Sequence, residues 1–275
     1  MGRRTSLWVI AFIITVTTAY YQRVTGPTYP VKEKMTIDGS SISGVFDRSH
    51  DGDGNHLVEI KVADTNVIGN LYWKRYKTND DWNIILMKRE DDKLSASLPH
   101  QPPAGKLLYK VVLQNGNSDI TIPSEPVVIR FKGAVPLYFL IPHVIFMFMA
   151  MLLAARTGLE IFNKEPKFYK LTTYTLIILF VGGLILGPIV QKYAFGEFWT
   201  GVPFGIDLTD NKTLIAFIGW LVAFIAVQRN KNPKFWVVFA AILMFVIFLI
   251  PHSVLGSELD YNKYEKSNII FDESK

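Results

Sequence analysis

Two histidines lie in or directly after strongly apolar stretches and are the residues of this sequence best suited to chemistry. His143 ends the segment FLIPH at 139–143, and His252 ends the identical segment at 248–252. An unpaired imidazole is costly in lipid, so a histidine in such a stretch is a functional candidate by default. Two neutral imidazoles that face each other can ligate a haem iron. Alternatively, each histidine hydrogen-bonds to a neighbouring helix or lies at the membrane boundary.

The two histidines are expected at similar depths in a membrane. His143 precedes Arg156 by 13 residues, and His252 follows Lys234 by 18 residues. In a helix these separations correspond to about 20 Å and about 27 Å. A difference of about 7 Å can be closed by helix tilt and side-chain reach. The spacing therefore allows both side chains to meet one ligand.

A loop rich in aromatic, glycine and acidic residues connects two apolar stretches at 191–212. Its rings could pack against a flat cofactor, and its lysines could pair with propionates. The candidate residues of this loop are Lys192, Glu197, Phe198, Trp199, Phe204, Asp207, Asp210 and Lys212. Glu258 and Asp260 in the tail add two carboxylates that we expect on the same face. Since aromatic residues also form belts at membrane surfaces, the loop is either an interfacial connection or a platform over a cofactor.

Part of this region resembles the tryptophan-rich periplasmic loop of haem-handling membrane proteins of cytochrome c assembly. The resemblance is carried by 195–199, Asp207, 210–214 and 220–221. In that family the loop cradles haem at the outer membrane face and flanking histidines ligate the iron, which implies haem b with His143 and His252 as ligands. The loop has one tryptophan where the family has several, and the Trp-Asp core of the family is not reproduced. The whole chain also resembles a class of uncharacterised bacterial membrane proteins with five spans and an exported Ig-like domain.

Five apolar stretches must position these residues. A helix needs about 20 mostly apolar residues to cross about 30 Å of hydrocarbon. The stretches lie at 7–21, 135–155, 171–190, 213–227 and 235–250. They predict an α-helical membrane protein with five transmembrane helices, and the first is expected to be a retained anchor and not a cleaved signal peptide.

The placement of positive charge predicts the topology. Lys and Arg near helix ends favour the cytoplasmic side. Three basic groups fall on one side if the N-terminus is inside: Arg3 and Arg4; Arg156, Lys164, Lys167 and Lys170; and Arg229, Lys231 and Lys234. The prediction is a multi-pass protein of the bacterial inner membrane, with its N-terminus in the cytoplasm and its β domain and C-terminus outside it.

Between the first two stretches, residues 35–132 alternate between apolar and polar side chains with a period of two, which is typical of strands. The strand candidates are 56–63, 71–76, 82–88, 93–98, 107–113 and 127–132. Short strands separated by turn signals favour an inserted all-β sandwich of the immunoglobulin or fibronectin-III type. Such a domain suits a membrane or periplasmic protein partner, and fold alone assigns it no chemistry.

The motif DGDGN at 51–55 resembles the start of a calcium loop. An EF-hand loop then requires glycine at its sixth position and glutamate at its twelfth, where this sequence has His56 and Val62. A turn before a strand is therefore the preferred interpretation. His50, His56 and His100 are expected to be ordinary surface or strand residues.

Several function classes find no support in the sequence. It contains no cysteine, no nucleophile elbow, no P-loop and no metalloprotease helix motif. The last four apolar stretches have no central carboxylate, which argues against an ion-coupled transporter. The basic groups are explained by topology, so nucleic acid is not an expected partner, whereas the lipid bilayer is.

The predicted organisation is an anchor at 1–22, a linker at 23–34, a β domain at 35–132, a four-helix membrane domain at 133–252 and an exported tail at 253–275. The functional hypothesis is a site at the outer face that binds haem b for electron transfer or haem handling. The alternative is a non-catalytic membrane scaffold or sensor whose β domain binds a partner protein. The sequence leaves open whether the protein is an enzyme.

Overall fold

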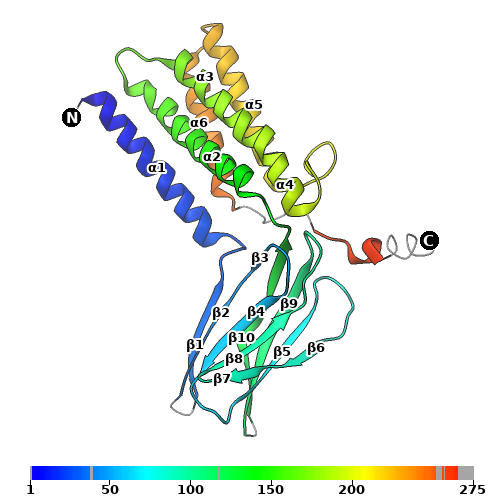
Figure 1. Ribbon diagram of the computed structural model, residues 1–275. Helices are drawn as coiled ribbons and strands as arrows, with labels where there is room; N and C mark the ends of the chain where they lie inside the picture. Colours follow the sequence, from blue (N-terminus) through cyan, green and yellow to red (C-terminus); the bar gives the residue numbers. More distant parts are fainter. Residues whose placement is uncertain (1, 38–39, 117, 252–255, 257, 266–275) are drawn as a thin grey trace, which may run out of the picture. The chain divides into compact units, whose positions relative to one another are not determined.

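The structure is a computed structural model that describes residues 2–37, 40–116, 118–251, 256 and 258–265 (Figure 1). The chain divides into two compact units. A helical unit consists of Met1–Pro27 and Val135–Ser257, and a β unit consists of Thr28–Ala134 and the chain from Glu258 onward. Each unit is described separately below.

The β unit contains two five-stranded sheets. The first sheet has the order β1 (Val31–Ile37), β2 (Ser40–Phe46), β4 (His56–Val62), β8 (Lys93–Leu98) and β7 (Lys88–Glu90). The second sheet has the order β3 (Ser49–Asp51), β10 (Ser118–Lys132), β9 (Lys106–Asn115), β5 (Ile68–Arg75) and β6 (Asn83–Leu86). Pairing is antiparallel except between β3 and β10, which are parallel.

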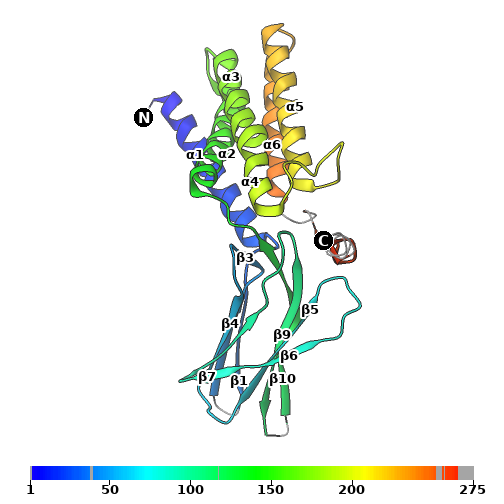
Figure 2. The ribbon, with the colours of Figure 1, turned by 45° about the vertical axis from the view of Figure 1, so that its right-hand side comes forward.

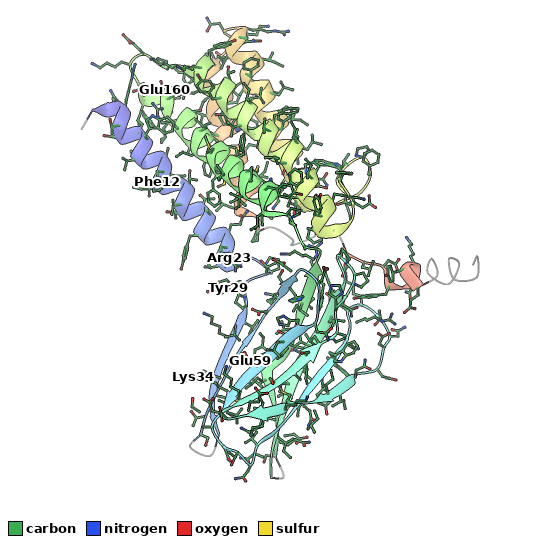
Figure 3. All side chains as sticks on the ribbon, viewed as in Figure 1. Phe12, Arg23, Tyr29, Lys34, Glu59 and Glu160 are labelled. Carbon is green, nitrogen blue, oxygen red and sulfur yellow. The ribbon has the colours of Figure 1, made fainter. Side chains whose placement is uncertain are left out.

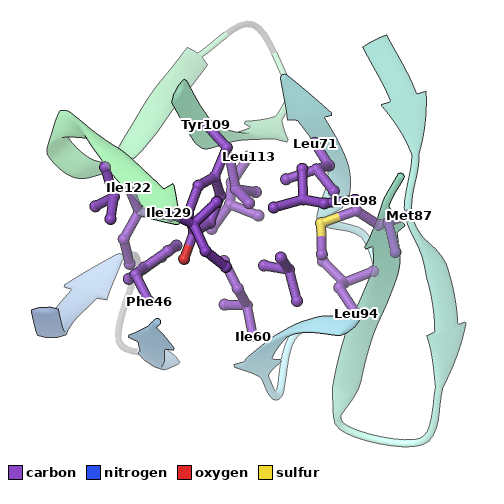
Figure 4. Close-up of a cluster of buried hydrophobic side chains, with 14 of the residues drawn as sticks. Phe46, Ile60, Leu71, Met87, Leu94, Leu98, Tyr109, Leu113, Ile122 and Ile129 are labelled. Atoms are coloured by element: carbon purple, nitrogen blue, oxygen red, sulfur yellow. The ribbon is translucent and has the colours of Figure 1, made fainter. Parts of the chain in front are cut away.

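Side chains on the inner faces of the two sheets pack together into a hydrophobic core. In β4 every second residue is buried, beginning with His56, because successive side chains of a strand point to opposite faces. Ile60 and Leu94 from the first sheet and Leu71 and Tyr109 from the second belong to the same buried cluster (Figure 4). Burying such apolar surface is the main source of stability for a domain without disulfides.

The helical unit packs its helices side by side (Figures 1 and 2). Its elements are α1 (Arg3–Thr25), α2 (Leu137–Gly158), η1 (Leu159–Phe162), α3 (Phe168–Leu179), η2 (Phe180–Leu186), α4 (Gly187–Phe195), α5 (Leu208–Gln228) and α6 (Pro233–Leu249). The short η2 is a π-helix that joins α3 to α4. Small residues line the helix contacts, and Ala150, Ala154 and Gly219 are buried.

Four helical stretches within the described residues are long and apolar enough to cross a membrane: Arg3–Thr25, Leu137–Phe162, Phe168–Phe195 and Leu208–Gln228. The fifth apolar helix, α6, has 17 residues. That length corresponds to about 26 Å, short of the roughly 30 Å hydrocarbon core. The helix ends at Leu249 because the residue before a proline disfavours helical angles, and Ile250, before Pro251, is extended.

The predicted fold class was therefore wrong. The sequence analysis expected a five-span helical membrane domain into which a β-sandwich is inserted. Instead, two sheets with ten strands dominate the N-terminal half of the chain after a single helix, and the remaining helices follow them. Hydropathy overestimates the span at 235–250, because the helix there, α6, has only 17 residues.

Candidate functional site

His143 lies in the second turn of α2 and is fixed by a backbone carbonyl of η2. Its Nδ1 is 2.9 Å from the carbonyl oxygen of Gly182. Because a carbonyl can only accept, Nδ1 must carry the hydrogen, and Nε2 of the neutral ring then carries a lone pair. Within the described residues Nε2 forms no hydrogen bond. His143 is therefore held in the tautomer that leaves Nε2 available as a ligand.

The glycines of η2 make this hydrogen bond possible. A Cβ added to Gly182 would lie 2.8 Å from Cβ of Phe146, and one added to Gly183 would lie 2.6 Å from Cγ2 of Thr213. Only glycine lets η2 approach α2 and α5 this closely. A Cβ on Gly187 would lie 3.6 Å from Cε1 of His143, which is an ordinary contact. Single π-helical turns inside α-helices are frequently found at functional sites.

Asp210, in the first turn of α5, shapes the loop between α4 and α5. Its Oδ2 accepts hydrogen bonds from the backbone nitrogens of Thr200 (2.6 Å) and Gly201 (3.0 Å) and from Nε2 of Gln191 (2.9 Å). Asn211 adds a bond from the backbone nitrogen of Val202 to its Oδ1 (2.8 Å). The loop thus has a defined conformation although it lies outside regular secondary structure.

Asp207 caps α5, and Lys212 ties α5 to the end of α6. The Asp207 side chain accepts the backbone N–H of Thr209 at 2.8 Å, as N-cap residues do. Nζ of the buried Lys212 donates to the carbonyls of Ile250 (2.8 Å) and Pro251 (3.3 Å). Its ammonium group is therefore engaged with backbone oxygens next to His252, which itself lies outside the described residues.

Gln22 of α1 also binds the backbone at the end of α6. Its Nε2 is 2.6 Å from the carbonyl oxygen of Phe248 and 3.4 Å from that of Ile250. The carbonyls at the end of α6 cannot be paired within the helix, so Gln22 and Lys212 provide the donors. Sequence reasoning missed this role of Gln22, although an isolated amide at the end of an apolar stretch indicates that a partner must be present.

The aromatic candidates of the loop are partly exposed. Phe198 is 55% exposed and its ring lies 5.5 Å from Nζ of Lys192, while Phe204 is 82% exposed. The indole N–H of Trp199 donates to the carbonyl of Val202 at 3.1 Å. These rings therefore lie at the surface of the loop. His143, in contrast, lies against Gly182 and Gly187.

Lys192 and Glu197 lie on the exposed rim of the loop. Lys192 donates to the carbonyl of Gly196. Both side chains are accessible. Of the two lysines that sequence analysis assigned to propionates, Lys192 is thus accessible and Lys212 is buried.

The tail carboxylates belong to the β unit. Glu258 pairs with Nζ of Lys77 (2.8 Å) and of Lys106 (3.3 Å). Burial alone would raise the pKa of Glu258, but the bonds and charges of the two lysines outweigh it and hold the pKa below its ordinary value. Asp260 accepts the backbone N–H of Asn262 at 3.1 Å within the tail. These groups therefore act in a different unit from His143.

Tyr261 is the buried anchor of the tail on the β unit. Its hydroxyl accepts the backbone N–H of Lys106 at 3.0 Å and lies 3.0 Å both from Oε1 of Gln101 and from the carbonyl oxygen of Lys106. Burial raises the pKa of Tyr261 to about 12. The guanidinium of Arg75 lies 5.1 Å from the tyrosine ring and also pairs with Glu265. The sequence motif around Tyr261 carried no signal for this contact.

A buried ion pair joins α2 to η1 in the helical unit. Arg156 pairs with Glu160, which is labelled in Figure 3, and both side chains are almost fully buried. Glu160 also accepts hydrogen bonds from Nδ2 of Asn163 (2.6 Å) and from the backbone nitrogen of Lys167 (2.8 Å). The Arg156 guanidinium lies 5.4 Å from the ring of Trp8. This contact brings the start of α1 to the end of α2.

Neither a family model nor a curated protein sequence matches this chain.

Proposed function

We propose that the helical unit binds haem b and serves electron transfer or haem handling, with His143 as a residue that would hold the iron. The observation that carries this proposal is the 2.9 Å hydrogen bond between Nδ1 of His143 and the carbonyl of Gly182. Histidines that bind metals almost always donate their other ring N–H to a carbonyl or carboxylate, which fixes the tautomer and orients the ring. Nε2 of His143 is the donor atom that such an arrangement presents.

His252 is proposed as the second ligand. Its own geometry lies outside the described residues, so its support comes from the preceding segment. Lys212 and Gln22 hold the carbonyls of Ile250, Pro251 and Phe248 at the end of α6. A ligand on an anchored segment loses less conformational freedom on binding than one on a free chain.

The loop between α4 and α5 is proposed as the cover of the haem. Phe198, Trp199 and Phe204 would pack against the ring, and an apolar surround is one of the factors that set a haem potential. Lys192 is accessible for a propionate, whereas Lys212 positions the His252 segment. When bound, the haem supplies one-electron chemistry. In this proposal the aromatic side chains of the loop would orient the ring.

We infer that the protein resides in the bacterial cytoplasmic membrane with its basic helix ends inside. The contact between Trp8 and Arg156 puts the start of α1 beside the end of α2. The stacking of Tyr169 on Phe224, at 5.9 Å, puts the start of α3 beside the end of α5. The basic groups at these ends thus gather on one side, as the preference for cytoplasmic Lys and Arg requires. The β unit and the C-terminus would lie on the other side.

This topology can be tested with single cysteines, because the chain contains none. Glu125→Cys lies in the β unit, and Lys231→Cys lies in the basic connection between α5 and α6. A membrane-impermeant maleimide applied to intact cells should label the variant at position 125 and spare the one at 231, and permeabilisation should make both reactive. Labelling of position 231 in intact cells would contradict the topology.

Haem binding is tested by comparing histidine variants purified from haem-supplied cells. The wild type should retain about one haem per chain, and His143→Ala should lose most of it. His100→Ala is the matched control, because His100 lies in the β unit, and it should retain haem like the wild type. Equal haem content in all three would contradict the assignment of His143. If none binds haem, the scaffold function, with a protein partner on the β unit, takes precedence.

A further inference from the structure

Two imidazoles of the β unit face each other across a short turn. His50 lies on β3 and His56 begins β4, and the glycines between them, Gly52 and Gly54, have φ angles of 89° and 111°. This left-handed backbone is accessible to glycine at little cost. The turn folds the chain back so that Nδ1 of His50 lies 3.3 Å from Nδ1 of His56. His50 is half-buried and His56 is buried.

The outer nitrogen of each ring faces an acceptor. Nε2 of His50 is 3.2 Å from the carbonyl oxygen of Gly54, so it must carry the hydrogen. Nε2 of His56 is 3.9 Å from the carboxylate of Asp47, which is too far for a hydrogen bond but close enough for charge attraction. The two Nδ1 atoms therefore face each other in one of two arrangements. Either they share a proton in a hydrogen bond, or both carry lone pairs that a metal ion between them can accept.

The separation of the two nitrogens matches a specific kind of cation. Zinc binds imidazole nitrogens at about 2.0–2.1 Å in tetrahedral geometry. Two ligands at that distance and angle lie about 3.3–3.4 Å apart, which agrees with the observed 3.3 Å. The carbonyl of Gly54 and the carboxylate of Asp47 are the kinds of partner that orient metal-binding histidines.

We propose that His50 and His56 form a binding site for a divalent transition-metal ion of the zinc or copper type. Imidazole ligands suit these ions, whereas calcium prefers oxygen ligands. Within the described part of the chain no group of three or more His, Cys, Asp or Glu side chains is arranged to hold a metal. Water or an external ligand therefore completes the coordination, and the site keeps open positions.

The surroundings favour an ion at this place. Asp51 and Asp53 lie on the turn between the two histidines and add negative charge, of which Lys132 neutralises part by pairing with Asp51 at 3.1 Å.

The test is zinc binding to the full-length chain without an affinity tag, in detergent, by competition with a chromophoric zinc chelator. We expect His50→Gln and His56→Gln each to bind one zinc ion fewer per chain than the wild type. His100→Gln should bind as many as the wild type. The rings of His100 and His50 both contact Phe131, but among the described residues His100 does not join the pair in a group of three metal-binding side chains. Circular dichroism would establish that each variant is folded.

Two results would overturn the proposal. Unchanged zinc stoichiometry in His50→Gln would mean that the two rings share a proton instead of a metal ion. His50→Gln is the more informative variant, because His50 is half-buried and its substitution disturbs the fold less than that of the buried His56. An equal loss in His100→Gln would indicate adventitious surface binding. The outcome is independent of the haem proposal, since His143→Ala should leave the difference between wild type and His50→Gln intact.

Discussion

At the scale of single residues, polar side chains in this protein stabilise chain ends that regular structure leaves unpaired. Asp210 accepts two backbone N–H groups of the loop before α5, and Lys212 and Gln22 donate to carbonyls at the end of α6. Leaving such buried groups unpaired would cost about 1–3 kcal/mol each. The sequence indicated Lys212 as a cofactor contact and Asp210 as a polar residue of the same outer face, because both lie at one end of the apolar helices. Their hydrogen-bond partners could not be read from spacing along the chain.

Tyr261 gives a direct test of such pairing in the β unit. Tyr261→Phe removes the hydroxyl that accepts the Lys106 amide, and we expect a loss of about 1–3 kcal/mol, because a buried donor stays unpaired. Hydrogen exchange measured by mass spectrometry should show reduced protection of the peptide containing the Lys106 amide. Tyr72→Phe is the matched control, since the described contacts of Tyr72 are made by its ring. Equal protection in both variants would contradict the role of the Tyr261 hydroxyl.

At the scale of elements, the strands with strong alternation were predictable and the polar strands were not. The candidates at 56–63 and 93–98 correspond closely to β4 and β8. β1 and β2 were missed because β1 carries charged residues at an edge of its sheet and β2 is rich in serine, so neither has a clear apolar pattern. β1 and β2 form because they pair with neighbouring strands, and the pattern of a single sequence does not reveal which strands pair.

The π-helix η2 was likewise outside the reach of periodicity. Its apolar sequence fits an α-helix equally well, and a pair of glycines in such a helix is compatible with close helix packing and with contact to a cofactor. The structure shows helix packing for Gly182 and Gly183, and it places Gly187 beside the ring of His143. The carbonyl of Gly182 also accepts the Gly187 backbone N–H, as the π-helical pattern requires.

Gly182→Ala tests whether η2 positions His143. The added Cβ would lie 2.8 Å from Phe146 and must push η2 away from α2, at a cost of about 1–3 kcal/mol. The carbonyl then moves from Nδ1 of His143, so we expect a lower thermal midpoint in detergent and weaker haem retention. Gly187→Ala adds the same atom at an ordinary 3.6 Å contact and should change both far less. Equal effects of the two substitutions would contradict this role for η2.

At the scale of the whole molecule, composition indicated a membrane protein, and the described part of the chain includes four helical stretches long and apolar enough to cross a membrane. The five-span fold class failed because hydropathy does not report where a helix ends. Pro251 ends α6 early, after Leu249. The candidate site was predictable in part: His143 was selected from its apolar surroundings, whereas the carbonyl that orients it comes from a π-helix distant in sequence.

The measurement that tests haem binding most directly is the absorbance spectrum of wild-type protein, purified in detergent from haem-supplied cells, before and after reduction with dithionite. Binding through His143 and His252 predicts a Soret band and, on reduction, the sharp α band of a low-spin b-type haem. A colourless protein would contradict haem binding and leave the partner-binding scaffold as the better account of the molecule.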